Sequence, residues 1–352
     1  MLLGIGNFLG RGSGRVSGAA QMLAAYSQGL AIDGRDLSMV IKDTGTPANN
    51  FSGDANSKLT YASPSTKWVL GRSGLYESGT TLRTESNAGG TALGIRTEDL
   101  RTNLFLNSRT PSTQSVTTTA QSYTISGVGA VGATLTLSGT ATGTLTGTGA
   151  ADRDKLTVTA TAGSLTITVS GTWDFVQVEA GAVASSPIVT TGSTVTRAAD
   201  VTTLATNLFP SGFPLSIGVV GRIGAVPAGV WAGMVGMTNG IGTAGVHLGW
   251  SPSAQGKAVV GATPGADLSA NGTFTAGSRV RMAAAFAAND VAISLNGAAV
   301  TTDTAVSMPS GLTMLQLGAN YVGAVNPVGV HIEKLIIVPG RLSDAELQGL
   351  LA

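Results

Sequence analysis

The strongest constraint in this sequence is a two-residue alternation of apolar and hydroxyl side chains in the middle of the chain. From Tyr123 onward, the segments that carry it are SYTISG, ATLTLSG, GTLTGTG, KLTVTATAG and SLTITVSG, and WDFVQVEAG follows them. Each of the first five alternates Thr or Ser with another residue type and ends near a glycine. Because successive side chains of a β-strand point to opposite faces, this period predicts a meander of half-buried antiparallel strands.

Glycine is the most unusual part of the composition, with 50 glycines among 352 residues. The glycines follow no G-x-y period, which excludes a collagen-like triple helix. Many of them separate short runs of Val, Thr, Ile and Leu, as tight turns separate the strands of an all-β protein. The length suggests about two domains of ordinary size, each long enough to bury a hydrophobic core.

The charge and cysteine content exclude several classes of partner. Charged residues make up 11% of the chain and the net charge is +1, so nothing predicts nucleic-acid binding. No apolar run approaches the ~20 residues of a membrane helix, and we expect no membrane insertion. The absence of cysteine excludes disulfides and thiolate metal sites. The N-terminal stretch lacks a basic region followed by a continuous apolar one, so no signal peptide is expected.

Changes of pattern divide the chain into three predicted parts. Residues 1–100 are predicted to form an N-terminal attachment region with short irregular strands and one amphipathic helix from about Ser17 to Gln28. That helix either packs on its own domain or anchors the chain to a larger assembly. Residues 101–200 are predicted to form a middle β-sandwich, and residues 201–352 a second β domain.

Two local signals in the last part are more specific. Asn296-Gly297 follows the alternating segment VAISL, and it predicts a tight turn because both residues tolerate positive φ. Near the C-terminus, Ser343 and Glu346 have the spacing of a capping box, which predicts a short closing helix.

Motifs of catalytic and cofactor sites were compared with the sequence. It contains no G-x-S-x-G, H-E-x-x-H or EF-hand pattern. Gly127–Gly132 (GVGAVG) matches G-x-G-x-x-G, but a strand follows where a dinucleotide site needs a helix, so we interpret these glycines as a hairpin turn. His247 and His331 lie in strand-like apolar contexts and are predicted to be ordinary sheet residues. We therefore predict no catalytic residues, no cofactor and no enzyme activity.

Two further chemistries stay open. A glycosidase needs two carboxylates that face one substrate, and the candidates are Asp152, Asp154, Asp174, Glu179, Asp267, Asp290 and Glu333. Solvated turn charges are the simpler interpretation of these acids. A calcium site would use oxygen ligands, for which the candidates are Asn289, Asp290, Asn296 and Asp303. Turn formation explains the same residues without a metal.

Glycan binding needs an aromatic face beside polar side chains. Trp231, Trp250 and Tyr321 offer such faces, although core packing explains the tryptophans at least as well. Tyr321 lies in a loop-like segment together with polar neighbours. The predicted glycan ligands are Tyr321, Trp250, Asn320 and Asn326.

Three stretches resemble virion proteins of tailed bacteriophages and prophages. Ala92–Ser108 (ALGIRTEDLRTNLFLNS) is similar to the signature G-x-x-x-E-x-x-R-T-N-L-L-x-x-S, which precedes a β-sandwich in phage fibre and head-spike proteins. Gln177–Ala198 is similar to the pattern Q-x-E-x-G, P-T-T and V-T-R-A-A, which closes that sandwich. The C-terminal region, with its Asn-Gly turn and LSDAEL, resembles a concanavalin-like, laminin-G-like jelly roll. The residues that match the first two patterns are Gly94, Glu98, Arg101, Thr102, Asn103, Leu104, Ser108, Gln177, Glu179, Gly181, Pro187, Thr190, Thr191, Thr196, Arg197 and Ala198.

This resemblance implies a virion structural protein, either a tail fibre, a tail spike or a head spike, assembled in the bacterial host cytoplasm. Its N-terminal part would attach to other virion proteins, and its jelly roll would bind host-surface polysaccharide. Such proteins are commonly homo-oligomers, often trimers. Two alternatives remain: a purely architectural capsid or tail decoration, and a virion-associated depolymerase that cuts the glycan.

Overall fold

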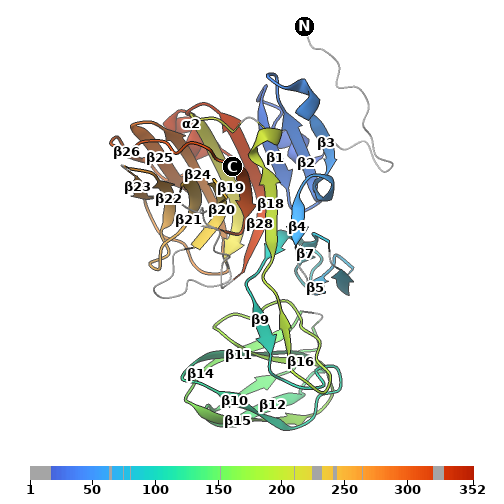
Figure 1. The fold of residues 1–352 in the computed structure, drawn as a ribbon. Coiled ribbons are helices and arrows are strands. Elements are labelled where there is room, and N and C mark those ends of the chain that lie inside the picture. The colour runs from blue at the N-terminus through green and yellow to red at the C-terminus, as the bar shows by residue number, and fades with distance from the viewer. Residues whose placement is uncertain are drawn as a thin grey trace.

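The computed structural model describes residues 17–62, 66–73, 75–79, 81–150, 152–209, 211–223, 232–240, 244–263, 265–319 and 329–352. Within these residues nearly all of the regular secondary structure is antiparallel strand, and the strands form a large and a small β-sandwich joined by a narrow neck (Figure 1). This arrangement confirms the predicted all-β class with a jelly-roll type of sandwich.

Two facing sheets form the large sandwich. The first runs in the order β26 (Thr301–Asp303), β25 (Asp290–Leu295), β24 (Arg279–Ala287), β19 (Leu215–Ile223), β28 (Val330–Pro339), β1 (Gly29–Asp33), β2 (Ser38–Lys42) and β3 (Phe51–Asp54), and β8 (Ala92–Thr97) joins it at β28 and carries β7 (Thr84–Ser86). The second runs in the order β23 (Ala266–Ser269), β22 (Gly256–Gly261), β21 (Gly245–Trp250), β20 (Ala232–Thr238), β27 (Met314–Leu317), β18 (Val201–Ala205) and β4 (Thr60–Ala62). Short 3₁₀ turns η1 (Pro47–Asn49), η2 (Ala55–Ser57) and η3 (Thr206–Leu208) connect some of these strands.

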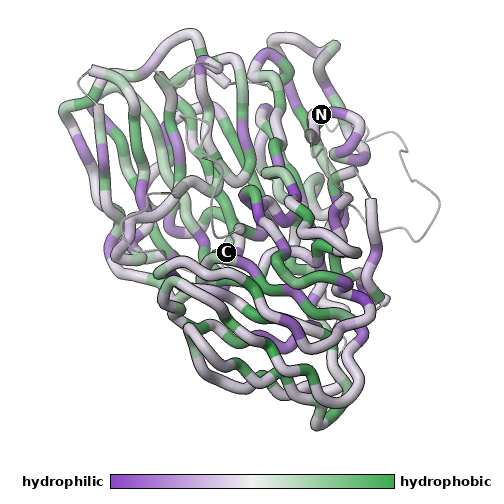
Figure 2. The backbone as a smooth tube through the Cα atoms, turned by 60° about the horizontal axis from the view of Figure 1, so that its bottom comes forward, coloured by the Kyte–Doolittle hydropathy of each residue, from purple (hydrophilic) through white to green (hydrophobic). Residues whose placement is uncertain are grey.

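The alternation of side chains along each strand builds the large core. In β24, Met282, Ala284 and Phe286 point between the two sheets, whereas Ala283 and Ala285 point to the outer face. Two short helices, α1 (Gly18–Met22) and α2 (Asp344–Gly349), cover that outer face. Figure 2 shows hydrophobic stretches within the strands of both sandwiches.

Strands between residues 29 and 97 belong to this large sandwich, which corrects the predicted separate region of residues 1–100. Strand β1 lies between β28 and β2, with Leu30 opposite Ile337 and Leu30 also opposite Ile41. All five residues of β1 are buried, as expected for a central strand covered on both faces. The sequence pattern missed this pairing because the partner strand lies near the other end of the chain.

The first of the two helices is shorter than predicted, whereas the closing helix has its predicted cap. The first ends at Met22 and not near Gln28, although Ser17 caps it as an N-cap by accepting a hydrogen bond from the backbone N–H of Ala20 (3.2 Å). The Lys42 ammonium donates to the carbonyls of Leu23 and Tyr26, so a side chain of β2 ends the helix. The closing helix has the predicted capping box between Ser343 and Glu346.

The small sandwich is a contiguous insertion in the large one. Its sheets run in the orders β10 (Gln114–Thr118), β15 (Gly163–Ser170), β12 (Thr134–Gly139), β13 (Gly143–Thr146), and β14 (Asp154–Ala160), β11 (Gln121–Gly129), β16 (Trp173–Ala180). The predicted meander is therefore wrong, because most consecutive strands lie in opposite sheets. Its own core contains apolar residues from Phe105 to Val178, within the range predicted for the middle sandwich.

The glycines of GVGAVG form no hairpin, because β11 and β12 belong to different sheets and the segment crosses between them. They have a packing role instead. A Cβ atom on Gly127 or Gly129 would lie 2.9 or 2.7 Å from ring carbons of Trp173. The glycines thus make room for the largest side chain of the small core.

The predicted turn at Asn296-Gly297 is confirmed. Asn296 and Gly297 have φ values of 52° and 81°, and the backbone N–H of Ala298 donates to the carbonyl of Leu295 (2.9 Å). Two positive φ values in succession are the signature of a type I′ turn, which Asn-Gly favours.

The neck consists of two chain passages between the sandwiches. Strand β9 (Arg101–Asn103) enters the small sandwich, strand β17 (Val195–Arg197) leaves it, and the two pair antiparallel. A hairpin of β5 (Lys67–Leu70) and β6 (Tyr76–Gly79) lies near this junction in Figure 1. No helix among the described residues is long and apolar enough to span a membrane.

Candidate functional site

The predicted glycan ligands do not come together as a site. The side chain of Trp250 is fully buried in the large core (0% exposed), so a sugar cannot reach its ring, and the prediction for this residue is corrected to core packing. Alternate residues of β21 face the core, and Val246 and Leu248 point the same way. Tyr321, Asn320 and Asn326 lie outside the described residues, as does Trp231.

The structure instead brings the two signature stretches together at the neck. In the β9–β17 pair, Arg101 lies opposite Arg197, and Thr102 bonds Thr196 through their hydroxyls (2.8 Å). Gly94 has a φ of 115°, and a Cβ there would lie 2.2 Å from the carbonyl oxygen of Ile332, so the close approach of two strands requires glycine.

Two buried amides fasten the chain at the top of the small sandwich. The Asn103 side chain accepts hydrogen bonds from the backbone N–H groups of Phe105 (3.0 Å) and Val178 (3.1 Å), and it donates to the carbonyl of Ile188 (2.8 Å). The Gln177 side chain accepts from the backbone N–H of Ile188 (2.8 Å) and donates to Glu179 (2.7 Å). Both amides are fully buried, and their bonds satisfy backbone groups that no strand partner reaches.

A cluster of charges lies beside these amides. The Glu98 carboxylate accepts from Ser186 N–H (2.7 Å) and from the Arg96 guanidinium (2.8 Å). The Asp200 carboxylate accepts from Lys67 Nζ (2.5 Å) and from the backbone N–H of Glu98 (3.0 Å). The backbones of the two acids are also hydrogen-bonded, since the N–H of Asp200 donates to the Glu98 carbonyl (2.8 Å). Each charge is therefore paired, as buried charges must be.

The cluster continues into the large sandwich through Glu85. Its carboxylate pairs with Arg96 (2.9 Å) and with His331 Nε2 (2.5 Å). Burial by itself would raise the pKa of Glu85, but the Arg96 guanidinium and the His331 bond outweigh burial and lower this pKa to about 2. Burial likewise opposes ionisation of Glu98, yet Arg96, Arg197 and Lys67 hold its pKa well below the ordinary value.

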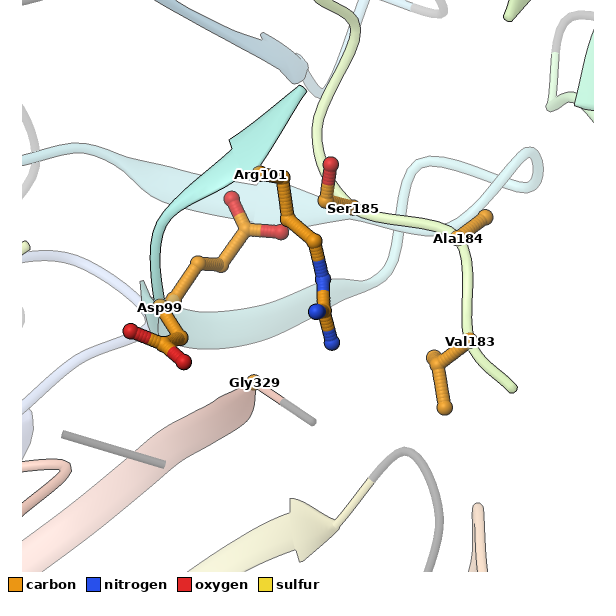
Figure 3. Close-up of a pocket in the computed structure, with 7 residues that line it drawn as sticks. Asp99, Arg101, Val183, Ala184, Ser185 and Gly329 are labelled. Carbon is orange, nitrogen blue, oxygen red and sulfur yellow. The ribbon is translucent and has the colours of Figure 1, made fainter. Parts of the chain in front are cut away.

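The space inside this junction is too small for a ligand. Figure 3 shows the Arg101 side chain between Asp99 on one side and Val183 and Ala184 on the other. The cavity beside it has a volume of about 10 Å³. That is room for about one water molecule and not for a sugar ring. The junction is consequently a site that holds two sandwiches together, and its polar groups bond to one another.

Open grooves lie at the surface of the large sandwich. One has a volume of about 920 Å³ along β2 and β3, where Phe51, Asn50 and Asp43 line it. The Lys58 ammonium lies 5.2 Å from the centre of the Phe51 ring. A second groove of about 490 Å³ separates α1 from α2, with Tyr26 and Ile336 in its wall.

Most of the remaining sequence candidates bond to other groups of the protein. Among the carboxylates, Asp267 pairs with Lys257, Asp290 with Arg341, Glu333 with Arg279, Asp152 with Lys155, and Asp154 accepts from Thr148. Glu179 is buried at the neck and Asp174 is exposed. Among the residues considered for calcium, Asn296 accepts from Arg281 N–H and Asp303 from Ala305 N–H. Within the described residues, no three His, Asp or Glu side chains converge as metal ligands would.

The histidines differ in their surroundings. His247 is buried on β21, and burial lowers its pKa to about 4, which agrees with an ordinary sheet residue. His331 belongs to the neck cluster through Glu85. Sequence reasoning missed Lys67, Glu85, Arg96 and Asp200 as members of one cluster. The chain has few charges, so charged residues inside strand-like segments are the sequence signal by which this cluster could have been found.

No protein-family model matches the chain, and no curated protein matches it. Among solved structures, the NanB sialidase from Streptococcus pneumoniae is similar over 42% of this chain and 26% of its own, with 13% identity and a TM-score of 0.34. Domain 4 of AbnA, an extracellular arabinanase from Geobacillus stearothermophilus, is similar over 44% of this chain and 73% of its own, with 16% identity and a TM-score of 0.37. The sialidase CBM40 of Ruminococcus gnavus, bound to sialyllactose, is similar over 40% and 83%, with 15% identity and a TM-score of 0.34. The chain spans about a quarter of the NanB chain, and likenesses this distant assign it neither a family nor a function.

Proposed function

We propose that the chain is a structural protein of a tailed-bacteriophage virion, namely a tail fibre, tail spike or head spike. The observation that supports this best is the convergence of the two signature stretches. They are separated in sequence by the strands of the small sandwich, yet Asn103 bonds Val178 and Glu98 bonds Ser186 inside one buried unit. These stretches are the passages that enter and leave the small sandwich, and their buried polar groups bond to one another there.

We further propose that the large sandwich binds a host-surface glycan and that the protein acts as a homo-oligomer with other virion proteins. The open groove along β2 and β3 supports a binding role, because its volume of about 920 Å³ is in the range of ligand sites. Since strands from the first hundred and the last hundred residues build this one sandwich, attachment and glycan binding share a domain in this proposal and are not separated along the chain.

A glycan assay tests the binding role. The recombinant chain is incubated with purified host-surface polysaccharide, and the mixture is read for bound glycan and for new reducing ends. We expect binding without new reducing ends. Phe51→Ala should weaken binding if the groove is the site, whereas Val131→Ala, at an 82% exposed position on the small sandwich, is the matched control and should not. Binding that both variants retain in full would place the glycan elsewhere.

A second experiment tests the location. Phage particles are purified from cultures of the source bacterium, and their proteins are identified by mass spectrometry and by immunogold labelling with an antibody against the recombinant chain. Labelling of fibres or spikes is the expected result. Particles that contain other structural proteins but never this chain would contradict the virion role.

A purely architectural decoration protein is the second candidate. The observation that favours it is that the buried polar cluster at the neck joins the two sandwiches and leaves only water-sized space. A glycan depolymerase is less well supported, because most of its candidate carboxylates already bond cations or backbone groups. The glycan assay separates the three candidates, since decoration gives neither signal and a depolymerase gives new reducing ends.

A further inference from the structure

Lys67 and Asp200 meet inside the neck although 133 residues separate them. Nζ of Lys67, the first residue of β5, lies 2.5 Å from Oδ2 of Asp200, which directly precedes β18. Their side chains are 7% and 0% exposed. An amine and a carboxyl group are thus held in contact, away from water, on two segments that have no covalent tie.

From this geometry we propose that Lys67 and Asp200 condense into an intramolecular isopeptide bond. Glu98 carries protons in this reaction, and Tyr61 stabilises the oxygen on which negative charge develops. The proposal rests on the neck geometry and is independent of the virion role.

Two neighbouring groups have the positions that such an acyl transfer needs. Glu98 Oε2 lies 3.5 Å from Lys67 Nζ, within reach of the protons on that nitrogen. The hydroxyl of Tyr61 donates to Asp200 Oδ1 (2.8 Å), the oxygen opposite the one that Lys67 contacts. A donor aimed at that oxygen stabilises the tetrahedral intermediate in the way an oxyanion hole does. Arg197 Nη1, 3.7 Å from the same oxygen, adds positive charge there.

The reaction balances without any co-reactant. A proton moves from the Lys67 ammonium to Asp200 Oδ2, which leaves a neutral amine beside a carboxylic acid. The nitrogen lone pair then attacks Cγ of Asp200, and the carbonyl electrons move to Oδ1. Glu98 accepts a second proton from the nitrogen and delivers it to Oδ2, whose bond to Cγ breaks as water departs. The products are one amide and one water, and Glu98 returns to its starting state.

Burial favours this outcome in two ways. It holds the two reacting groups at an effective concentration that free groups in solution do not reach. It also makes an ion pair costly to keep, and an amide replaces two buried charges with a neutral group. Water released from the neck has little space in which to remain, because the adjoining cavity has a volume of only about 10 Å³.

The bond would close a ring around the whole small sandwich. Residues 67 and 200 lie on either side of it in sequence, and a cross-link there ties the β5–β6 hairpin to the start of β18. The chain has no cysteine, so a disulfide cannot supply such a tie. A cross-link also limits the unfolded chain, which raises resistance to heat and denaturant.

Intact-mass measurement of the denatured full-length protein tests the proposal directly. We expect a mass lower than that of the sequence by one water molecule. Trypsin should then fail to cut after Lys67 and should yield the peptide 59–72 linked to the peptide 198–222. A protein with the full sequence mass, aged at neutral pH and cut normally after Lys67, would overturn the proposal.

Controls separate the bond from other losses of water. A succinimide at Asp33-Gly34 gives the same mass change but no linked peptide, and finding only that change overturns the proposal. Lys257 and Asp267 (3.0 Å) form the matched pair without a buried third acid, and they should stay unlinked. Lys67→Arg keeps the positive charge and should abolish the linked peptide. Glu98→Gln should reduce it strongly, and unchanged linkage in that variant would overturn the role of Glu98.

Discussion

The two sandwiches solve the same packing problem with different stretches of chain. The small one is contiguous and takes its core from residues between Phe105 and Val178, where alternating strands surround Trp173. The large one combines strands that lie far apart in the sequence, since Leu30 of β1 and Ile337 of β28 are register partners in one sheet. A contiguous core has local contacts, whereas the large core depends on pairings that only a nearly complete chain can make. The small sandwich is therefore the more autonomous unit.

The neck differs from both cores because charges and amides hold it. Its buried acids and bases neutralise one another, since Glu98 and Asp200 pair with Lys67, Arg96 and Arg197. Such a cluster depends on all of its members, because the loss of one charge leaves another buried and unpaired. The neck therefore decides whether the two sandwiches behave as one cooperative unit.

Splitting the chain should give the largest effect. A fragment of residues 101–200 should fold, because its core is contained within it. A fragment of residues 201–352 should remain unfolded or aggregate, since it lacks β1, β2 and β8 and leaves β28 as an open edge. Circular dichroism and NMR shift dispersion measure both. A folded monomeric 201–352 fragment would show that the N-terminal strands are dispensable.

Breaking the neck charge cluster should come next. Glu98→Gln leaves Arg96 and Arg197 without their shared carboxylate, and we expect a loss of about 3–5 kcal/mol in unfolding free energy. The control is Glu77→Gln, whose partner Arg83 lies at the surface, and it should cost less than about 1 kcal/mol. Denaturant unfolding followed by Trp fluorescence measures both. Equal effects would contradict the assignment of the neck as the stabilising junction.

Removing space in the small core should have an intermediate effect. Gly129→Ala places a Cβ 2.7 Å from the Trp173 ring, which we expect to cost about 1–3 kcal/mol. Gly192→Ala, where nothing lies within 4 Å, is the control and should be nearly neutral. If the sandwiches unfold separately, the loss should appear in the small-sandwich transition alone. A loss spread over both transitions would show that the neck couples them.

Lowering the pH should have the smallest effect, because the unfolding free energy should stay constant near neutral pH. The pKa values of Glu85 and Glu98 are lowered in the folded state, so their stabilisation is fully present above the unfolded value near 4.5. It is lost as pH falls from there through the folded value, about 2 for Glu85. Unfolding free energies measured in steps between pH 7 and 2 should stay level and then decline. Glu85→Gln should flatten the decline, and an unchanged slope would exclude Glu85 as its cause.

Prediction from sequence succeeded where the signal is local. The Asn296-Gly297 turn and the Ser343–Glu346 capping box were found because a few neighbouring residues decide them. It failed for the meander, because alternation predicts strands but not their partners. It also misjudged Trp250, since an aromatic residue on an alternating strand has the same pattern whether its ring faces the core or a groove.

The all-β class, the absence of disulfides, the Asn296-Gly297 turn and the closing helix could be read from the sequence alone, because side-chain period and turn chemistry act over a few residues. The sequence also showed the two stretches that meet at the neck, residues 92–108 and 177–198. Tertiary contacts were needed to see that strands β1 to β4, β7 and β8 share a sandwich with strands from residues 201–352, and that Lys67, Glu98 and Asp200 lie together. Those contacts join segments that lie far apart in sequence. Local patterns define a strand, but they do not define which other strand covers its faces or pairs with its edges.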